Sequence, residues 1–256
     1  MKTAVVLGAS TGVGAAIAKE LSKTHYIAGF HRGRHLAEAR EVQRAIAADG
    51  GEYSFYESDA GSELADVDAS AGMLRHDSEV SVFVHSLSGA SLGTSLDLTS
   101  QKVERTMNVM AHSFLYWVQA LVKRELLADG AHVIALSNPC SDFYLRNTGV
   151  IGAAKAALEA YVRILAVELC GTAFVNCIRF STVVTPALQK VLSPESISGL
   201  TALHTQIVPA QRMQTADDVA GFVGRLVQDK WMNGAVIDYT GGATLTLMDR
   251  AFYGDR

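Results

Sequence analysis

The sequence predicts a doubly wound α/β fold, in which helices cover both faces of a mainly parallel sheet. Three observations support this prediction. The apolar, β-branched run at residues 3–7 is followed at once by Gly8, Gly12 and Gly14, and then by strong helix formers. Strand-like and helix-like patterns alternate along the rest of the chain. No linker, repeat or low-complexity stretch interrupts this alternation, so we expect a single domain.

The remaining elements follow from local patterns, taken in chain order. Apolar runs predict strands at residues 25–30, 52–57, 80–84, 131–136 and 174–180. Helical patterns separate these strands, at residues 36–48, 62–75, 97–127 and within 143–169. The first of these helices ends at Asp49-Gly50-Gly51, a typical C-terminal stop. Residues 187–208 form a mixed helical segment that contains Pro194.

Composition limits the kinds of partner that are expected. A chain of 256 residues with 49% hydrophobic residues can bury a sizeable core, and its net charge of −4 gives no reason to expect nucleic acid or an anionic membrane. Cys140, Cys170 and Cys177 lack metal-ligand spacing, so we expect reduced core cysteines and no metal. No secretory signal pattern and no apolar run approaching ~20 residues is present. These features predict a cytoplasmic protein without a membrane partner.

The glycine-rich turn at the start of the chain predicts a dinucleotide site. Gly8 permits a tight turn, Gly12 lets backbone approach a pyrophosphate, and Gly14 lets the next helix pack close to the strand. The N-terminus of that helix offers free N–H groups and a positive dipole to the phosphates. The residues expected to bind the cofactor here are Gly8, Ser10, Thr11, Gly12, Val13 and Gly14.

The end of the second strand indicates which cofactor is used. NAD-binding sheets usually place a carboxylate about 20 residues past the glycines, where it holds the ribose 2′-hydroxyl. This chain instead reads His31-Arg32-Gly33-Arg34, without a carboxylate. Guanidinium groups pair with a 2′-phosphate, so the pattern favours NADPH, bound through His31 and Arg32. The alternative is that Arg32 and Arg34 only solvate a loop.

The spacing G-x-x-x-G-x-G, in Gly8-Ala-Ser-Thr-Gly-Val-Gly14, resembles the short-chain dehydrogenase/reductase family. A second match, Ala154-Lys-Ala-Ala-Leu-Glu-Ala160, is similar to the family's catalytic helix, and residues 208–220 and 234–242 are similar to its closing helix and seventh strand. The resemblance covers essentially the whole chain. It implies a Rossmann-type, seven-stranded sheet in one domain spanning residues 1–256, and a homotetramer formed through the C-terminal strand and the helices near Tyr116 and Leu158.

Two segments are most similar to the enoyl-thioester reductases within this family, namely Val84-His-Ser-Leu87 and Gly149-Val-Ile-Gly-Ala-Ala-Lys155. The resemblance implies that Lys155 binds the nicotinamide ribose and lowers the pKa of a nearby acid. It implies that Asn108 kinks its helix and supports a water chain behind the lysine. Residues 187–208 would form a mobile substrate lid. Further cofactor contacts implied by the family are Asp59, Ala60, His85, Ser86, Val183 and Thr185.

The catalytic tyrosine of the family is missing. Its two usual positions hold Ile151 and Thr148, and Ser137 and Asn138 stand where the family places a serine. Tyr144 is a candidate replacement donor that could equally pack as a loop aromatic, whereas Thr148 is a poor acid. Weaker donor candidates are Tyr116 and Ser137, and His85 is either a proton relay or a polar residue satisfied at a strand end.

The missing phenol influences the predicted reaction. Ketone reduction normally depends on a general acid, which contributes about 10²–10⁴-fold to the rate. Reduction of a C=C bond conjugated to a thioester needs only hydrogen-bond stabilisation of the enolate before protonation. We therefore predict an NADPH-dependent reductase of enoyl groups carried on CoA or acyl-carrier protein. The alternatives are a ketoacyl reductase with a relocated acid and a non-catalytic NADP(H)-binding sensor, the latter disfavoured by the presence of both Lys155 and Asn108.

Overall fold

A computed structural model describes residues 2–59, 64–74, 79–89, 91–143 and 145–246. Its centre is one sheet of seven strands in the order β3-β2-β1-β4-β5-β6-β7, and every neighbouring pair is parallel. The predicted doubly wound, seven-stranded fold is therefore confirmed. The strands are β1 Lys2–Leu7, β2 Tyr26–His31, β3 Tyr53–Glu57, β4 Glu79–His85, β5 Leu127–Ser137, β6 Ala173–Phe180 and β7 Val236–Tyr239.

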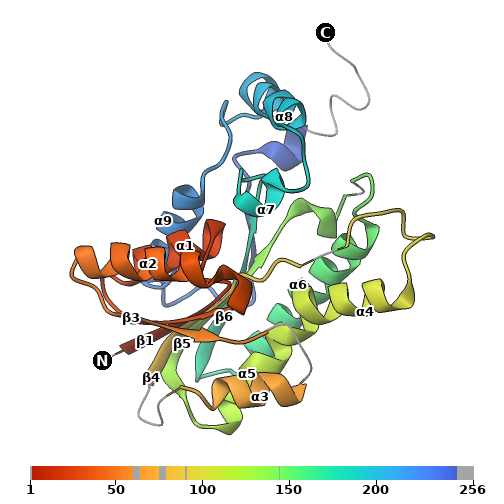
Figure 1. The fold of residues 1–256 in the computed structure, drawn as a ribbon. Coiled ribbons are helices and arrows are strands. Elements are labelled where there is room, and N and C mark those ends of the chain that lie inside the picture. The colour runs from red at the N-terminus through yellow and green to blue at the C-terminus, as the bar shows by residue number, and fades with distance from the viewer. Residues whose placement is uncertain (1, 60–63, 75–78, 90, 144, 247–256) are drawn as a thin grey trace.

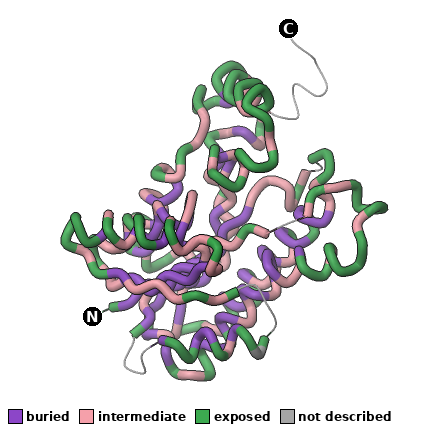
Figure 2. Tube along the Cα trace, in the orientation of Figure 1, coloured by how far each residue is buried: buried purple, intermediate pink, exposed green. Residues whose placement is uncertain are grey.

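Helices cover both faces of this sheet, so that the strands are buried between two layers (Figures 1 and 2). One face packs against α1 Gly12–Leu21, α2 Leu36–Ala48 and α9 Ala216–Leu226. The other face packs against α3 Leu64–Ala71, α5 Ser113–Lys123 and α6 Gly149–Glu168, with α4 Ser100–Met107 beside α6. Adjacent strand residues face opposite layers, as a strand's two-residue period requires: Val5 joins one core cluster and Val6 the other.

The strand order reverses between β1 and β4, because the chain crosses from β3 back to the other side of β1. In open α/β sheets, ligands bind beyond the carboxyl ends of the strands at such a switch point. The segments that follow β1, β4, β5 and β6 all lie at this edge of the sheet. The fold therefore brings together the glycine turn, the His85–Ser86 segment and the start of α6.

The segment expected to be helical from 97 to 127 is divided into three parts. After α4, a π-helical turn, η2 Asn108–His112, interrupts the helix at the asparagine where the resemblance implies a kink. The helix then continues as α5 and ends at Lys123, because Glu125 takes a left-handed conformation with φ 54°. The expected end near residue 127 is wrong, since Leu127 already belongs to β5.

The segment after β6 lies beyond the carboxyl edge of the sheet, where α8 extends past α7 (Figure 1). It contains α7 Pro186–Gln189 and α8 Pro194–Ile207. Pro194 is the first residue of α8, where its missing N–H costs no helical hydrogen bond, and the Ser193 hydroxyl accepts from the Ser196 N–H. In α8 only His204 is buried. None of the helices in the described residues combines the length and apolarity needed to cross a bilayer.

Candidate active site

The glycine turn after β1 packs tightly against neighbouring backbone. A Cβ atom on Gly8, which has a φ of 75°, would overlap the Ser86 carbonyl oxygen, and one on Gly14 would overlap the Gly8 carbonyl oxygen. Gly12 has a φ of 57°, and a Cβ there would lie 3.1 Å from Thr185 Cγ2. Only glycine fits these positions without strain. The turn thereby meets both Ser86 after β4 and Thr185 after β6.

The N-terminus of α1 opens directly from this turn. Thr11 is its N-cap residue, yet no side chain caps the first turn, and the first turn carries no acidic residue. The unsatisfied N–H groups and the helix dipole therefore favour an anion. Ser10 and Val13 are buried beside the turn, whereas Thr11 is half-buried. A glycine cradle beside an uncapped helix N-terminus fits the pyrophosphate of a dinucleotide, as the sequence predicts.

A cluster of arginines lies near the end of β2. Burial lowers the pKa of Arg32, and the positive charges of Arg34 and Arg105 lower it further, whereas Asp59 opposes these effects. Within the described part of the chain, neither Arg32 nor Arg105 forms an ion pair. Arg105 comes from α4, so local sequence reasoning did not find it. This cluster leaves positive charge where an anionic ligand could bind.

The neighbouring His31 is buried, and its ring lies 5.2 Å from the Phe55 ring. Its Nδ1 lies 3.0 Å from the Arg32 carbonyl oxygen. The side chain therefore packs between the strand ends, and a cofactor contact by His31 remains a prediction. Ala60, also expected to bind the cofactor, lies outside the described residues.

Lys155 is buried on α6, where its Nζ donates a hydrogen bond to the Leu136 carbonyl oxygen at 2.7 Å. Burial lowers the pKa of Lys155 to about 8, against the opposing effects of Cys177, Glu159 and Cys140. The protonation state of the Lys155 amino group is therefore sensitive to its surroundings. Residues of α6 also contact the π-helical turn that begins at the half-buried Asn108.

His85 lies in the core at the end of β4. Its side chain is fully buried, and its Nε2 lies 2.8 Å from Ser113 Oγ. The Ser113 hydroxyl donates to the Val109 carbonyl oxygen, so it accepts from His85 Nε2–H. Burial, and secondarily the charge of Lys155, lowers the pKa of His85 to about 3, which keeps its ring neutral. Any contact between His85 and a cofactor would therefore be made by the His85 backbone and not by its ring.

Ser137 and Asn138, the two candidates at the end of β5, have different surroundings. Ser137 is fully buried, and its hydroxyl donates to Glu159 Oε1 at 2.6 Å. Glu159 also accepts a hydrogen bond from Arg179 at 2.8 Å, so Ser137 belongs to a buried ionic network. Asn138 is partly exposed, and its Oδ1 accepts from the Cys140 N–H at 3.1 Å. Of the two side chains, Asn138 is the one exposed in part to solvent.

The two usual tyrosine positions hold side chains without an acidic proton near neutral pH. Ile151 is buried in the apolar core. Thr148 is the N-cap residue of α6, and its hydroxyl donates to the Leu145 carbonyl oxygen at 2.8 Å. Tyr116 lies on α5, where its ring contacts the His112 ring. Tyr144, the main candidate replacement, lies outside the described residues.

Comparison with known proteins identifies the family. A family model described as enoyl-(acyl carrier protein) reductase matches residues 8–244. The chain belongs to the short-chain dehydrogenase/reductase superfamily. It is 29% identical over 246 residues to an uncharacterized oxidoreductase of Methylorubrum extorquens, covering 94% of this chain and 97% of the relative. The protein, called this short-chain reductase from here on, is thus an oxidoreductase.

Two further relatives are similar along nearly their whole length. Versicolorin reductase 1 of Aspergillus parasiticus is 26% identical over 255 residues, which cover 94% of this chain and 96% of that protein. The angucycline C-6 ketoreductase LanV, solved with bound NADP, superposes with a TM-score of 0.84 at 24% identity, covering 95% of this chain and 96% of that one. The superposition shows that LanV and this chain share a fold.

The three cysteines of this short-chain reductase are all free thiols, as predicted, but they are not all core residues. Cys177 is buried, whereas Cys170 is exposed and Cys140 is half-buried. Cys140 lies on a short turn, η3 Pro139–Ser141, that packs against α6. The sequence-based expectation of core packing is therefore wrong for the exposed Cys170, whereas Cys140 packs against the core although it is only half-buried.

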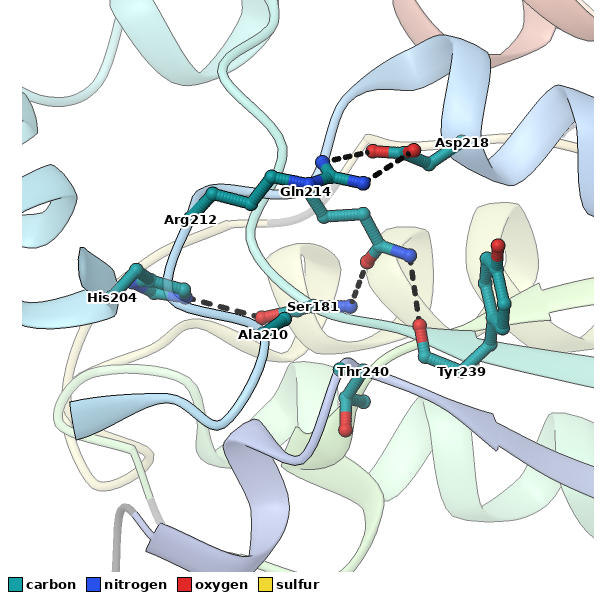
Figure 3. A pocket seen from close by; sticks show the side chains of 9 residues that line it. Ser181, His204, Ala210, Arg212, Gln214, Asp218, Tyr239 and Thr240 are labelled. Atoms are coloured by element: carbon teal, nitrogen blue, oxygen red, sulfur yellow. Dashed lines mark hydrogen bonds and ion pairs between the residues drawn. The ribbon is translucent and has the colours of Figure 1, made fainter. Parts of the chain in front are cut away.

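A small cavity of about 130 Å³ lies between α8, the start of α9 and the carboxyl ends of β6 and β7 (Figure 3). Its polar side chains already have partners. Gln214 accepts from the Ser181 N–H and donates to the Tyr239 carbonyl oxygen, and His204 Nε2 lies 3.2 Å from Ser181 Oγ. Arg212 and Asp218 form an ion pair. These contacts attach the segment after β6 to the sheet.

The Gly12 cradle can be tested against a glycine with the same backbone strain. Gly12→Ala should weaken NADP(H) binding by about tenfold or more, because the methyl group would crowd Thr185 at the phosphate site. Gly50 also has a positive φ, of 80°, but open space around it, so Gly50→Ala is the matched control. Both variants should lose about 1–2 kcal/mol of stability. Equal cofactor affinity of the two variants in fluorescence titrations would contradict the proposed cradle.

Proposed function

We propose that this short-chain reductase uses NADPH to reduce the C=C bond of an α,β-unsaturated acyl thioester. The observation that carries the proposal is that α6 keeps Lys155 but presents no phenol at either family position. Ile151 is buried in the core, and the Thr148 hydroxyl is bonded to backbone. The family model's description as an enoyl-(acyl carrier protein) reductase supports the same reaction.

The residues present suit a reaction with a modest demand for acid catalysis. Bound NADPH would supply the hydride, which adds to the β-carbon of the substrate. Lys155 would hold the ribose hydroxyls, and the Val183–Thr185 segment would hold the carboxamide and pyrophosphate beside the glycine turn. Hydrogen-bond donors at Asn138 and Lys155, held in place by the fold, would stabilise the enolate oxygen as its negative charge develops.

Exposed apolar side chains support an acyl substrate. Leu92 and Leu96 follow β4, Leu145 follows β5, and Val184 and Val191 follow β6. A hydrogen bond joins the segment after β4 to the segment after β5, because the Gly93 N–H donates to the Asn147 carbonyl oxygen at 3.0 Å. Because parallel strands end at one edge, the segments that carry these side chains all leave the sheet at that edge. We infer that they contact an acyl chain delivered by CoA or acyl-carrier protein, beneath a lid at residues 187–208.

The arginine cluster supports NADPH in place of NADH. The positive charges of Arg34 and Arg105 act on Arg32 beyond the end of β2 and lower its pKa, whereas the Asp59 carboxylate opposes them. A 2′-phosphate carries the complementary negative charge, whereas a 2′-hydroxyl would leave the cluster unneutralised. The sequence-based preference for NADPH therefore has support from a third arginine on a different helix.

A second candidate is reduction of a carbonyl group. The name of the similar LanV protein describes a ketoreductase, which favours this alternative. Carbonyl reduction would require a relocated acid, for which Tyr144 is the candidate named from the sequence. The two candidates differ in the bond reduced and can be separated by product analysis.

The reaction can be tested with matched enoyl and β-ketoacyl thioesters that share one acyl chain. We expect NADPH oxidation with the enoyl member and a product heavier by two hydrogen atoms, measured by mass spectrometry. Turnover limited to the β-ketoacyl member would establish the carbonyl alternative. Binding of NADPH without turnover of any linear or cyclic member would count against both reactions.

The cofactor preference can be tested at Arg32. Arg32→Ala should lower kcat/KM for NADPH by about ten- to one-hundredfold, the effect of losing one charge-assisted hydrogen bond, and should leave kcat/KM for NADH nearly unchanged. Arg44→Ala removes an exposed arginine from α2 and serves as the charge control. An equal effect of Arg32→Ala on both cofactors would show that this arginine does not read the 2′-phosphate.

A further inference from the structure

We propose that the Cys140 thiol is the proton donor that replaces the missing tyrosine. This inference rests on the proposed function and names the acid for that reaction. It begins from the position of the η3 turn, which follows β5 and places Cys140 two residues after Asn138. The Asn138 side chain fixes the turn by accepting the Cys140 N–H.

Gly152 allows the turn to approach the catalytic helix. A Cβ atom at Gly152 would overlap the Cys140 carbonyl oxygen and would lie 3.9 Å from the Cys140 Cβ atom. Gly152 precedes Lys155 by three residues, a spacing that places both on one side of a helix. Cys140 therefore packs against the side of α6 that carries the catalytic lysine, and it stays half-buried at the edge of the core.

The surroundings of the Cys140 sulfur suit a general acid. Burial raises the pKa of the thiol above its usual 9.0, so the thiol stays protonated at neutral pH. The positive charge of Lys155 opposes that rise, because it stabilises the thiolate. Thr148 stands where the enoyl reductases usually carry tyrosine, so the thiol lies beside the vacated position.

The other candidates near Lys155 are less suited to proton transfer. Cys177 is buried on β6, and burial raises the pKa of its thiol to about 12. The Ser137 proton is committed to Glu159. Cys140 thus combines partial exposure, an available proton and a neighbouring positive charge.

Hydride addition to the β-carbon leaves an enolate whose oxygen carries the charge. The Cys140 S–H bond then breaks, and its proton forms a C–H bond at the α-carbon. The thiolate, stabilised by the Lys155 ammonium group, takes a proton from water to regenerate the thiol. The sum is reduction of one C=C bond with consumption of one NADPH and one proton.

The test compares wild type, Cys140→Ala and Cys140→Ser in D₂O, with an enoyl thioester that carries an α-methyl group. Wild type should deliver deuterium to one face of the α-carbon and give a single configuration. Cys140→Ala should lose about 10²–10⁴-fold in kcat, and solvent should then deuterate both faces. Cys140→Ser should lie between them, since its hydroxyl is a weaker acid. Cys170→Ala is the matched control at an exposed thiol and should behave as wild type.

Retention of both kcat and a single configuration in Cys140→Ala would overturn the inference. Loss of both in Tyr144→Phe, with Cys140→Ala active, would assign the proton to a relocated phenol and would overturn it equally. Failure of wild type to reduce any enoyl thioester would be a failure of the proposed function. The kcat comparison on a ketone substrate would then decide the role of the thiol.

The proposed proximity of the Cys140 thiol to Lys155 can also be tested without substrate. The rate of Cys140 alkylation by iodoacetamide, followed by peptide mass spectrometry, should rise with pH as the thiolate forms. Lys155→Gln should shift the midpoint of this rise to higher pH, because it removes the positive charge that stabilises the thiolate. An unchanged midpoint would contradict the placement of the thiol beside the lysine and would overturn the inference.

Discussion

The buried ammonium group of Lys155 is the physical constraint that acts on its neighbours in the candidate active site. The lysine is removed from solvent and held by the Leu136 carbonyl oxygen, so its charge acts on its neighbours with little screening. It helps keep the His85 ring neutral and favours the thiolate form of Cys140. β5 supplies the carbonyl group and α6 supplies the lysine, and the short η3 turn lies between these two elements in the chain.

The cofactor end of the site depends on backbone contacts between segments that are far apart in sequence. Gly8 and Gly14 bring the first turn against the end of β4, and Gly12 brings it against Thr185 after β6. These approaches fix the helix N-terminus of α1 at the switch point of the sheet. The arginine cluster lies farther out, at the end of β2, where it suits the ribose end of a dinucleotide.

Local patterns were sufficient to predict most of the framework. The α2 helix has the predicted bounds, 36–48, because its apolar periodicity and its Asp49-Gly50-Gly51 stop are both local signals. The strand–glycine–helix start was likewise a local signal, whereas the kink at Asn108 was implied by the family resemblance. The end of α5 could not be predicted from local patterns, since a glutamate in the left-handed conformation, here Glu125, is an unusual helix stop.

Contacts between distant segments account for what the sequence could not reveal. The hydrogen bond from Ser137 to Glu159 joins β5 to α6, and the charge of Arg105 on α4 acts on Arg32 after β2. The approach of Cys140 to α6 depends on the shape of one short turn and on Gly152 in the facing helix. Such placements follow from packing, which single-sequence patterns do not encode.

The central claim is that hydride from NADPH reaches the β-carbon of an enoyl thioester, and isotopic tracing tests it most directly. A single turnover with NADPH deuterated at the transferable position would be quenched and the product examined by NMR. The account predicts deuterium at the β-carbon of a saturated acyl thioester. Deuterium found only on the carbinol carbon of a reduced β-ketoacyl thioester, with the enoyl thioester recovered unchanged, would contradict it.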